Sequence, residues 1–131
     1  MFGLVGHAYV YFIYGMYNCF NVVAYNPETQ KAGAVLIRAL KPVYNIEGMI
    51  FRRKKQKLEE LTSGSGKLCR ALDISRNENS LPLWKGNLLI ADDNNFGGFE
   101  IVSGSRIGIK SGAEFDYRYY VKDCEFVSRI K

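Results

Sequence analysis

The chain has 131 residues, of which 47% are apolar and 24% charged, and its net charge is +5. This length suits one domain with a single core, and no apolar run reaches the ~18 residues that a membrane-spanning helix needs. The N-terminus lacks the features of a secretory signal peptide, so we expect an intracellular protein. Three scattered cysteines fit neither a disulfide framework nor a zinc motif, and a single histidine nearly excludes a Ser-His-Asp triad.

The first predicted element is an aromatic β-hairpin in the stretch "HAYVYFIYGMYNCFNVVAY". Residues 7–14 and 17–25 are rich in aromatic and β-branched side chains, which are typical of strands. Gly15 lies between them and supplies the backbone freedom of a tight turn. We therefore expect Tyr14 and Met16 near the tip of the hairpin.

Side chains alternate across a strand, so Tyr9 and Tyr11 are expected on one face of this hairpin. Tyrosine offers a flat ring and a hydroxyl group, both of which suit a nucleobase, and stacking a base on such a ring contributes ~1–3 kcal/mol. A tyrosine-rich sheet face with solvated hydroxyl groups explains the composition equally well. Composition alone leaves both interpretations open.

A turn-rich loop at 25–33 precedes "AVLIRAL" (34–40), which indicates a buried strand. Arg38 is the odd residue in this strand, because a buried charge needs a partner or a polar cavity. It can equally emerge on a solvent-exposed face. Asn45 is the expected N-cap of a helix over 45–61. The apolar residues that can share one face of this helix are Ile46, Met49, Ile50, Leu58 and Leu61.

The rest of the chain predicts one more helix, at 67–74, followed by a loop and a series of short strands. These strands are expected at 88–91, 99–102, 106–109, 118–121 and 125–128. Since strands outnumber helices, we predict an α+β fold, with residues 1–131 forming a single domain around a largely antiparallel sheet flanked by helices.

Two segments are candidates for contacts with phosphate. The run "RRKKQK" (52–57) most often forms a solvated helix face, and attraction to a nucleic-acid backbone is the alternative. "SGSGK" (63–67) opens a helix, where backbone N–H groups and Lys67 can hold a phosphate. It is not a nucleotide-hydrolysing P-loop, because Leu68 stands where that motif needs serine or threonine. An ordinary helix start remains the alternative.

Five motifs in order resemble those of the alkyladenine (3-methyladenine) DNA glycosylase family. They are "MF…GHAYVYFIYGMYNCFNVV", "AVLIRALKP", "SGSGKLCRALDI", "SRIGI" and "RYYV…FVS", and they span nearly the whole chain. The resemblance implies a single domain with a curved antiparallel sheet and a protruding β-hairpin. It also implies a monomer that binds duplex DNA, flips an alkylated or deaminated purine out of the stack and hydrolyses its N-glycosidic bond, with no metal or cofactor.

The resemblance assigns roles to the residues of the hairpin. It implies that Tyr14, with Met16 beside it, fills the gap left by the flipped nucleotide. The base pocket would be formed by Tyr11, which stacks on the flipped base, by Tyr9, and by Asn21, which senses the purine edge.

The same resemblance assigns catalytic and phosphate-binding roles outside the hairpin. Arg38 would help to hold the attacking water, and the backbone carbonyl of Ile109 would also contact it. Ser65, Gly66 and Lys67 would contact a DNA phosphate.

One feature departs from the pattern of the family. The resemblance implies a glutamate general base in a segment upstream of Met1, and no remaining carboxylate takes a motif position. We therefore expect an N-terminally truncated glycosylase that lacks its catalytic base. The alternatives are a short protein that binds damaged DNA or other nucleic acid without cutting it, and a structural domain with no nucleic-acid role.

Overall fold

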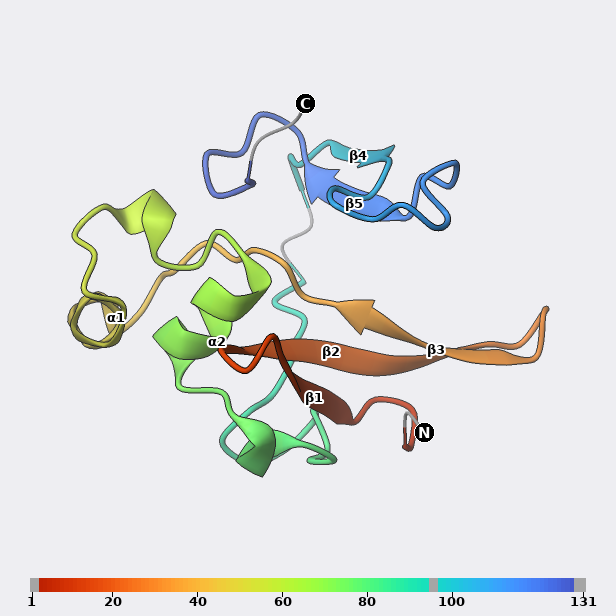
Figure 1. Cartoon of the computed structure of the whole chain (residues 1–131), viewed down its shortest axis with the longest axis horizontal. Coiled ribbons are helices and arrows are strands. Elements are labelled where there is room, and N and C mark those ends of the chain that lie inside the picture. Colours follow the sequence, from red (N-terminus) through yellow and green to blue (C-terminus); the bar gives the residue numbers. More distant parts are fainter. Residues whose placement is uncertain (1–2, 95–96, 129–131) are drawn as a thin grey trace.

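A three-stranded antiparallel sheet and two short helices form the main body of the protein (Figure 1). The computed structural model describes residues 3–94 and 97–128; Met1 and Phe2, which open the first motif, lie outside them. The elements are β1 (Ala8–Ile13), β2 (Tyr17–Asn26), β3 (Lys31–Leu36), α1 (Ile46–Arg53), α2 (Ser65–Leu72), β4 (Ile101–Gly104) and β5 (Arg118–Val121). Two 3-10 turns, Leu58–Glu60 and Arg76–Glu78, lie beside the helices. The predicted α+β class is confirmed.

The aromatic hairpin forms as predicted. β1 pairs with β2 from Ala8 opposite Val22 to Ile13 opposite Tyr17. The turn is closed by a hydrogen bond of 3.1 Å from the backbone N–H of Met16 to the carbonyl of Ile13. The outer edge of β1 is covered by residues 79–82, which exchange backbone hydrogen bonds with Ala8. This cover leaves the aromatic tip as the free end of the hairpin.

The prediction of a buried strand over 34–40 is wrong in its bounds and its burial. β3 begins at Lys31 and ends at Leu36, and the side chain of Val35 is 56% exposed. β3 is an edge strand that pairs only with β2 in the described sheet, so half of its surface stays open. Beyond it the chain continues without strand structure, and the N–H of Ile37 still donates to the carbonyl of Phe20 at 3.0 Å.

The helix predicted over 45–61 is much shorter than expected. α1 ends at Arg53 because Lys54 adopts the left-handed conformation (φ 55°), with its N–H bonded to the carbonyl of Ile50. Continuing the helix would place like charges on neighbouring positions, Arg52 beside Lys55 and Arg53 beside Lys57. The guanidinium group of Arg53 instead donates to the carbonyls of Leu61 and Glu60 at 3.0 and 3.2 Å, which folds the chain back on α1.

The helix predicted over 67–74 begins two residues earlier, at Ser65, and ends at Leu72. α2 packs against β2 on one side and α1 on the other. The predicted cap residue Asn45 does precede α1, but it lies in the left-handed region (φ 53°) and its side chain makes no capping hydrogen bond.

Two buried clusters form the core. The larger one joins the hairpin to α2 and the segment after it, through Ala8, Val10, Phe20, Leu68, Cys69, Ile74 and Leu83. The smaller one joins the two helices through Met49, Leu61 and Ala71. The larger cluster therefore anchors the hairpin to α2, whose first residues lie close to Tyr17 beside the turn, while Tyr14 and Met16 at the tip stay exposed.

The C-terminal third of the chain forms less strand structure than predicted. β4 and β5 pair with each other as a separate two-stranded sheet. The prediction of a single sheet is therefore wrong. Segments 88–91, 106–109 and 125–128 are not strands. Gly108, at φ 75°, places the second segment in a turn, and a turn bond from Val127 to Cys124 does the same for the third. Among the described residues no helix is long and apolar enough to cross a membrane.

Candidate nucleic-acid interface

The tip of the hairpin presents two large apolar side chains to solvent. Tyr14 is 83% exposed and Met16 is 67% exposed. Tyr14 (φ 54°) and Gly15 (φ 63°) both have positive φ, as the two central residues of a type I′ turn must. A bulky side chain is strained in that region, where asparagine or glycine is preferred. An exposed tyrosine in a strained conformation does not stabilise the fold, so its presence at position 14 indicates a functional role.

The face of the hairpin that carries Tyr9 and Tyr11 also carries Asn21. The two half-buried tyrosine rings lie 5.4 Å apart, tilted by 39°. Asn21 pairs with Tyr9 in the strand register and is buried, and its amide nitrogen donates to the backbone carbonyls of Tyr9 at 3.1 Å and Cys19 at 3.5 Å. These bonds orient the amide and leave its oxygen as the group available to a ligand. Burial, reinforced by Cys19, raises the pKa of Tyr11, so its hydroxyl stays protonated and can donate.

The N-terminus of α2 lies against the start of β2. A Cβ atom built on Gly66 would meet Cδ1 of the Tyr17 ring at 2.8 Å, closer than real side chains approach. Glycine is thus required here by a close approach to the hairpin. The thiol of Cys19 donates to the hydroxyl of Ser65 at 3.8 Å, and Lys67 is exposed. The structure therefore places the predicted phosphate loop directly beside the aromatic hairpin.

Arg38 and Ile109 lie on other segments. Arg38 follows β3 in the irregular segment and is half-buried, and within the described part of the chain it forms no hydrogen bond or ion pair. Ile109 lies in the long connection between β4 and β5 and is 39% exposed. Within the described residues, no hydrogen bond or ion pair joins either residue to the tyrosine face, so their catalytic roles remain predictions.

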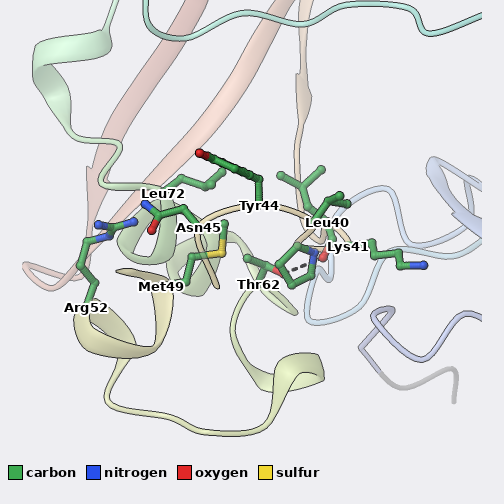
Figure 2. A pocket seen from close by; sticks show the side chains of 10 residues that line it. Leu40, Lys41, Tyr44, Asn45, Met49, Arg52, Thr62 and Leu72 are labelled. Carbon is green, nitrogen blue, oxygen red and sulfur yellow. Dashed lines mark hydrogen bonds between the residues drawn. The ribbon is translucent and has the colours of Figure 1, made fainter. Parts of the chain in front are cut away.

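Two cavities of about 410 Å³ each lie beside α1. Figure 2 shows the first, which contains Leu40, Tyr44, Met49 and Thr62, and in which the Thr62 hydroxyl donates to the carbonyl of Leu40 at 2.6 Å. Its lining includes no residue of the hairpin.

The second cavity lies between the hairpin and the helices. Met16, Tyr17 and Asn18 line one side of it, and α1 and α2 line the other. Its cationic residues are Arg52, Arg53, Lys67 and Arg70. In the sequence, residues 52–57 form one charged run and Arg70 carries no signal of a role, because only the packing of α1 on α2 brings these residues together. Over residues 3–94 and 97–128, no cluster of side chains suits a metal ion.

Comparison with known proteins agrees with this set of features. The family model of methylpurine-DNA glycosylases matches residues 1–125. The chain belongs to this family. The resemblance seen in the sequence motifs is thereby confirmed. By family the protein is a DNA glycosylase, a hydrolase of N-glycosyl bonds that serves DNA repair.

Curated relatives support the same assignment. A protein of Alkaliphilus oremlandii named "Putative 3-methyladenine DNA glycosylase" is 43% identical over 98% of this chain. Proteins of the same name from Clostridium novyi and Francisella tularensis are 39% and 42% identical over 95% and 98% of the chain. The chain spans 68%, 65% and 67% of the lengths of these three methylpurine-DNA glycosylase relatives.

Proposed function

We propose that this chain recognises alkylated and deaminated purines, 3-methyladenine among them, in duplex DNA by flipping the damaged nucleotide out of the stack. The observation that carries the proposal is the strained, solvent-exposed Tyr14 at the free end of an anchored hairpin. A planar side chain held at such a tip can replace the stacking lost when a nucleotide leaves the duplex, which offsets a few kcal/mol of unstacking.

The base pocket in this proposal is the tyrosine face of the hairpin. Tyr11 stacks on the flipped base, Tyr9 supports it, and the amide oxygen of Asn21 senses the purine edge, since the amide nitrogen is already bonded to backbone carbonyls. Ser65, Gly66 and Lys67 would hold a neighbouring phosphate. These last three residues adjoin the hairpin through the contact of Gly66 with Tyr17.

The chemical step in this proposal is hydrolysis of the N-glycosidic bond by a water that Arg38 and the carbonyl of Ile109 hold. A general base must remove a proton from that water, which contributes about 10²–10⁴-fold to the rate. No carboxylate of the described chain forms a hydrogen bond or ion pair with Tyr11, Asn21 or Arg38. We propose that the base comes from a residue outside these 131, so this chain alone binds lesions better than it excises them.

Binding to a duplex with one abasic-site analogue, compared with the same duplex undamaged, tests the recognition step. We expect tighter binding to the abasic duplex, because filling the gap there requires no flipping. A folded chain with equal affinity for both duplexes would contradict the proposal.

Single-turnover release of 3-methyladenine and hypoxanthine tests the chemical step. We expect slow release by the 131-residue chain and fast release by a version extended with upstream coding sequence. If the extended version binds lesions yet releases no base, the protein is a damage-binding module and not an enzyme.

A further inference from the structure

Two arginines link the C-terminal ends of α1 and α2 in a reciprocal way. Nε of Arg52 donates to the carbonyl of Ala71 at 2.7 Å, and Nε of Arg70 donates to the carbonyl of Arg52 at 3.0 Å. Each bond satisfies a carbonyl in the last turn of a helix, where no intrahelical partner exists. Both guanidinium groups are thereby held by Nε, and their terminal nitrogens are left for other partners.

These arginines lie in a concentrated positive field. Arg53 and Lys67 line the same cavity, and Asp73 is the carboxylate among its lining residues. Burial, and after it the neighbouring charge of Arg70, lowers the pKa of Arg53. In the described chain none of the four cations forms an ion pair with a carboxylate.

The position of this cavity limits what its ligand can be. Met16 and Tyr17 line it together with the arginines, so it lies beside the tip that carries Tyr14. A protein that places Tyr14 in a duplex brings these cations within reach of the nearby sugar–phosphate backbone. Planar guanidinium groups with free terminal nitrogens bind phosphate oxygens in a bidentate way.

We propose that the Arg52–Arg70 pair, with Arg53 and Lys67, is a binding site for a backbone phosphodiester beside the nucleotide that the hairpin displaces. This inference rests on the proposed function for the position of the duplex. It gives Arg70 a role that no sequence motif assigned, and it joins Arg52, until now one member of a charged run, to Arg70 in a single site. A purely structural role, in which the two arginines only cap helix ends, predicts lower stability without any change in the salt dependence of binding.

Binding of the full 131-residue chain to undamaged and abasic duplexes between 50 and 200 mM salt tests the site. For Arg70→Gln we expect on the order of tenfold weaker binding to both duplexes, and a slope of log K against log salt that is smaller by about 1. Lys55→Gln is the matched control, because it removes the same charge from an exposed residue outside the cavity. Equal slopes for the two variants, with Arg70→Gln still folded, would overturn the proposal.

A second measurement uses the unmodified protein and does not depend on the folding of a variant. A single neutral methylphosphonate is moved along both strands around the abasic analogue. We expect one or two adjacent positions to weaken binding as much as Arg70→Gln does, and the two changes together to cost no more than either alone. Uniform sensitivity at every position, or additive losses, would mean that the cavity holds no particular phosphate.

The outcome for this site is separable from that for the proposed function. If the unmodified chain binds abasic and undamaged duplexes equally, but Arg70→Gln still lowers the salt dependence of binding, nucleotide flipping is rejected and the phosphate site is supported. The reverse result would leave flipping in place and return Arg52 and Arg70 to a capping role.

Discussion

Gly66 at the start of α2 and Tyr17 at the start of β2 approach so closely that any Cβ atom at position 66 would overlap the Tyr17 ring, at 2.8 Å from Cδ1. The contact therefore requires glycine where α2 meets the hairpin. The same glycine belongs to the loop that is expected to hold a phosphate, so one residue links the position of the aromatic tip to that of the phosphate contact.

We expect Gly66→Ala to destabilise the protein by about 1–3 kcal/mol, because the ring and its backbone must move to make room. It should also weaken binding to the abasic duplex by displacing the tip. Urea unfolding and anisotropy of labelled duplex measure the two effects. Gly33→Ala is the control, since a Cβ at Gly33 meets nothing within 4 Å. Equal effects of the two substitutions would mean that the Tyr17 contact is not limiting.

Tyr14 should lower the stability of the fold while it increases the preference for abasic duplex. We expect Tyr14→Gly to raise the free energy of unfolding by about 1 kcal/mol, because glycine adopts φ 54° without strain. The same variant should lose most of the preference for abasic over undamaged duplex. Thermal unfolding and competition binding provide the two readouts. Tyr44→Ala is the control, because Tyr44 is as exposed (87%) but lies in the segment before α1. A Tyr14→Gly protein that keeps full abasic preference would show that the tip does not fill the gap.

Asn21 is held by two backbone carbonyls, and we expect its replacement to affect both stability and base choice. Asn21→Ala should cost about 1–3 kcal/mol, because buried hydrogen bonds are lost. It should also reduce the difference in binding affinity between duplexes with a lesion and duplexes with a normal purine. Asn26→Ala is the control on the same strand, since Asn26 is exposed and lies outside both the tyrosine face and the cationic cavity. If both variants discriminate lesions equally well, Asn21 is a structural residue only.

Because the thiol of Cys69 is buried, we expect the protein to lose stability at alkaline pH. Burial, with Cys19 nearby, raises the pKa of the Cys69 thiol from 9.0 to about 11. Since the unfolded thiol ionises first, the stabilisation is complete below pH 9 and is lost as pH rises towards 11. On the order of 2 kcal/mol is at stake. Thermal unfolding between pH 8 and 11 measures this loss, and Cys69→Ala should make the stability depend less on pH over that range. An unchanged pH dependence in Cys69→Ala would assign the loss to another group, such as Tyr11, whose pKa is also raised.

Local patterns in the sequence were sufficient to predict the hairpin and the existence of both helices. β-branched and aromatic alternation around a glycine specifies two paired strands and a turn, because strand period and turn chemistry are properties of neighbouring residues. The ordered motifs were sufficient for the family, which the comparisons confirm. The strand period and the turn were accordingly sufficient to predict Tyr9 and Tyr11 on one face and Tyr14 at the tip, whereas the strand register brings Asn21 to the same face as Tyr9.

Tertiary contacts decided what local patterns could not. α1 stops at Arg53 because the Arg53 side chain bonds to carbonyls eight and seven residues later, a gain that propensity scales do not include. The strands expected at 88–91, 106–109 and 125–128 do not form, since strand formation depends on packing and pairing with neighbouring strands and not on a short apolar run alone. Arg52 and Arg70 are 18 residues apart in the chain and meet only because α1 packs on α2. The sequence by itself determined the hairpin, the presence of two helices and the family, while long-range packing determined the length of α1, the strands of the C-terminal third and where charge accumulates beside the hairpin.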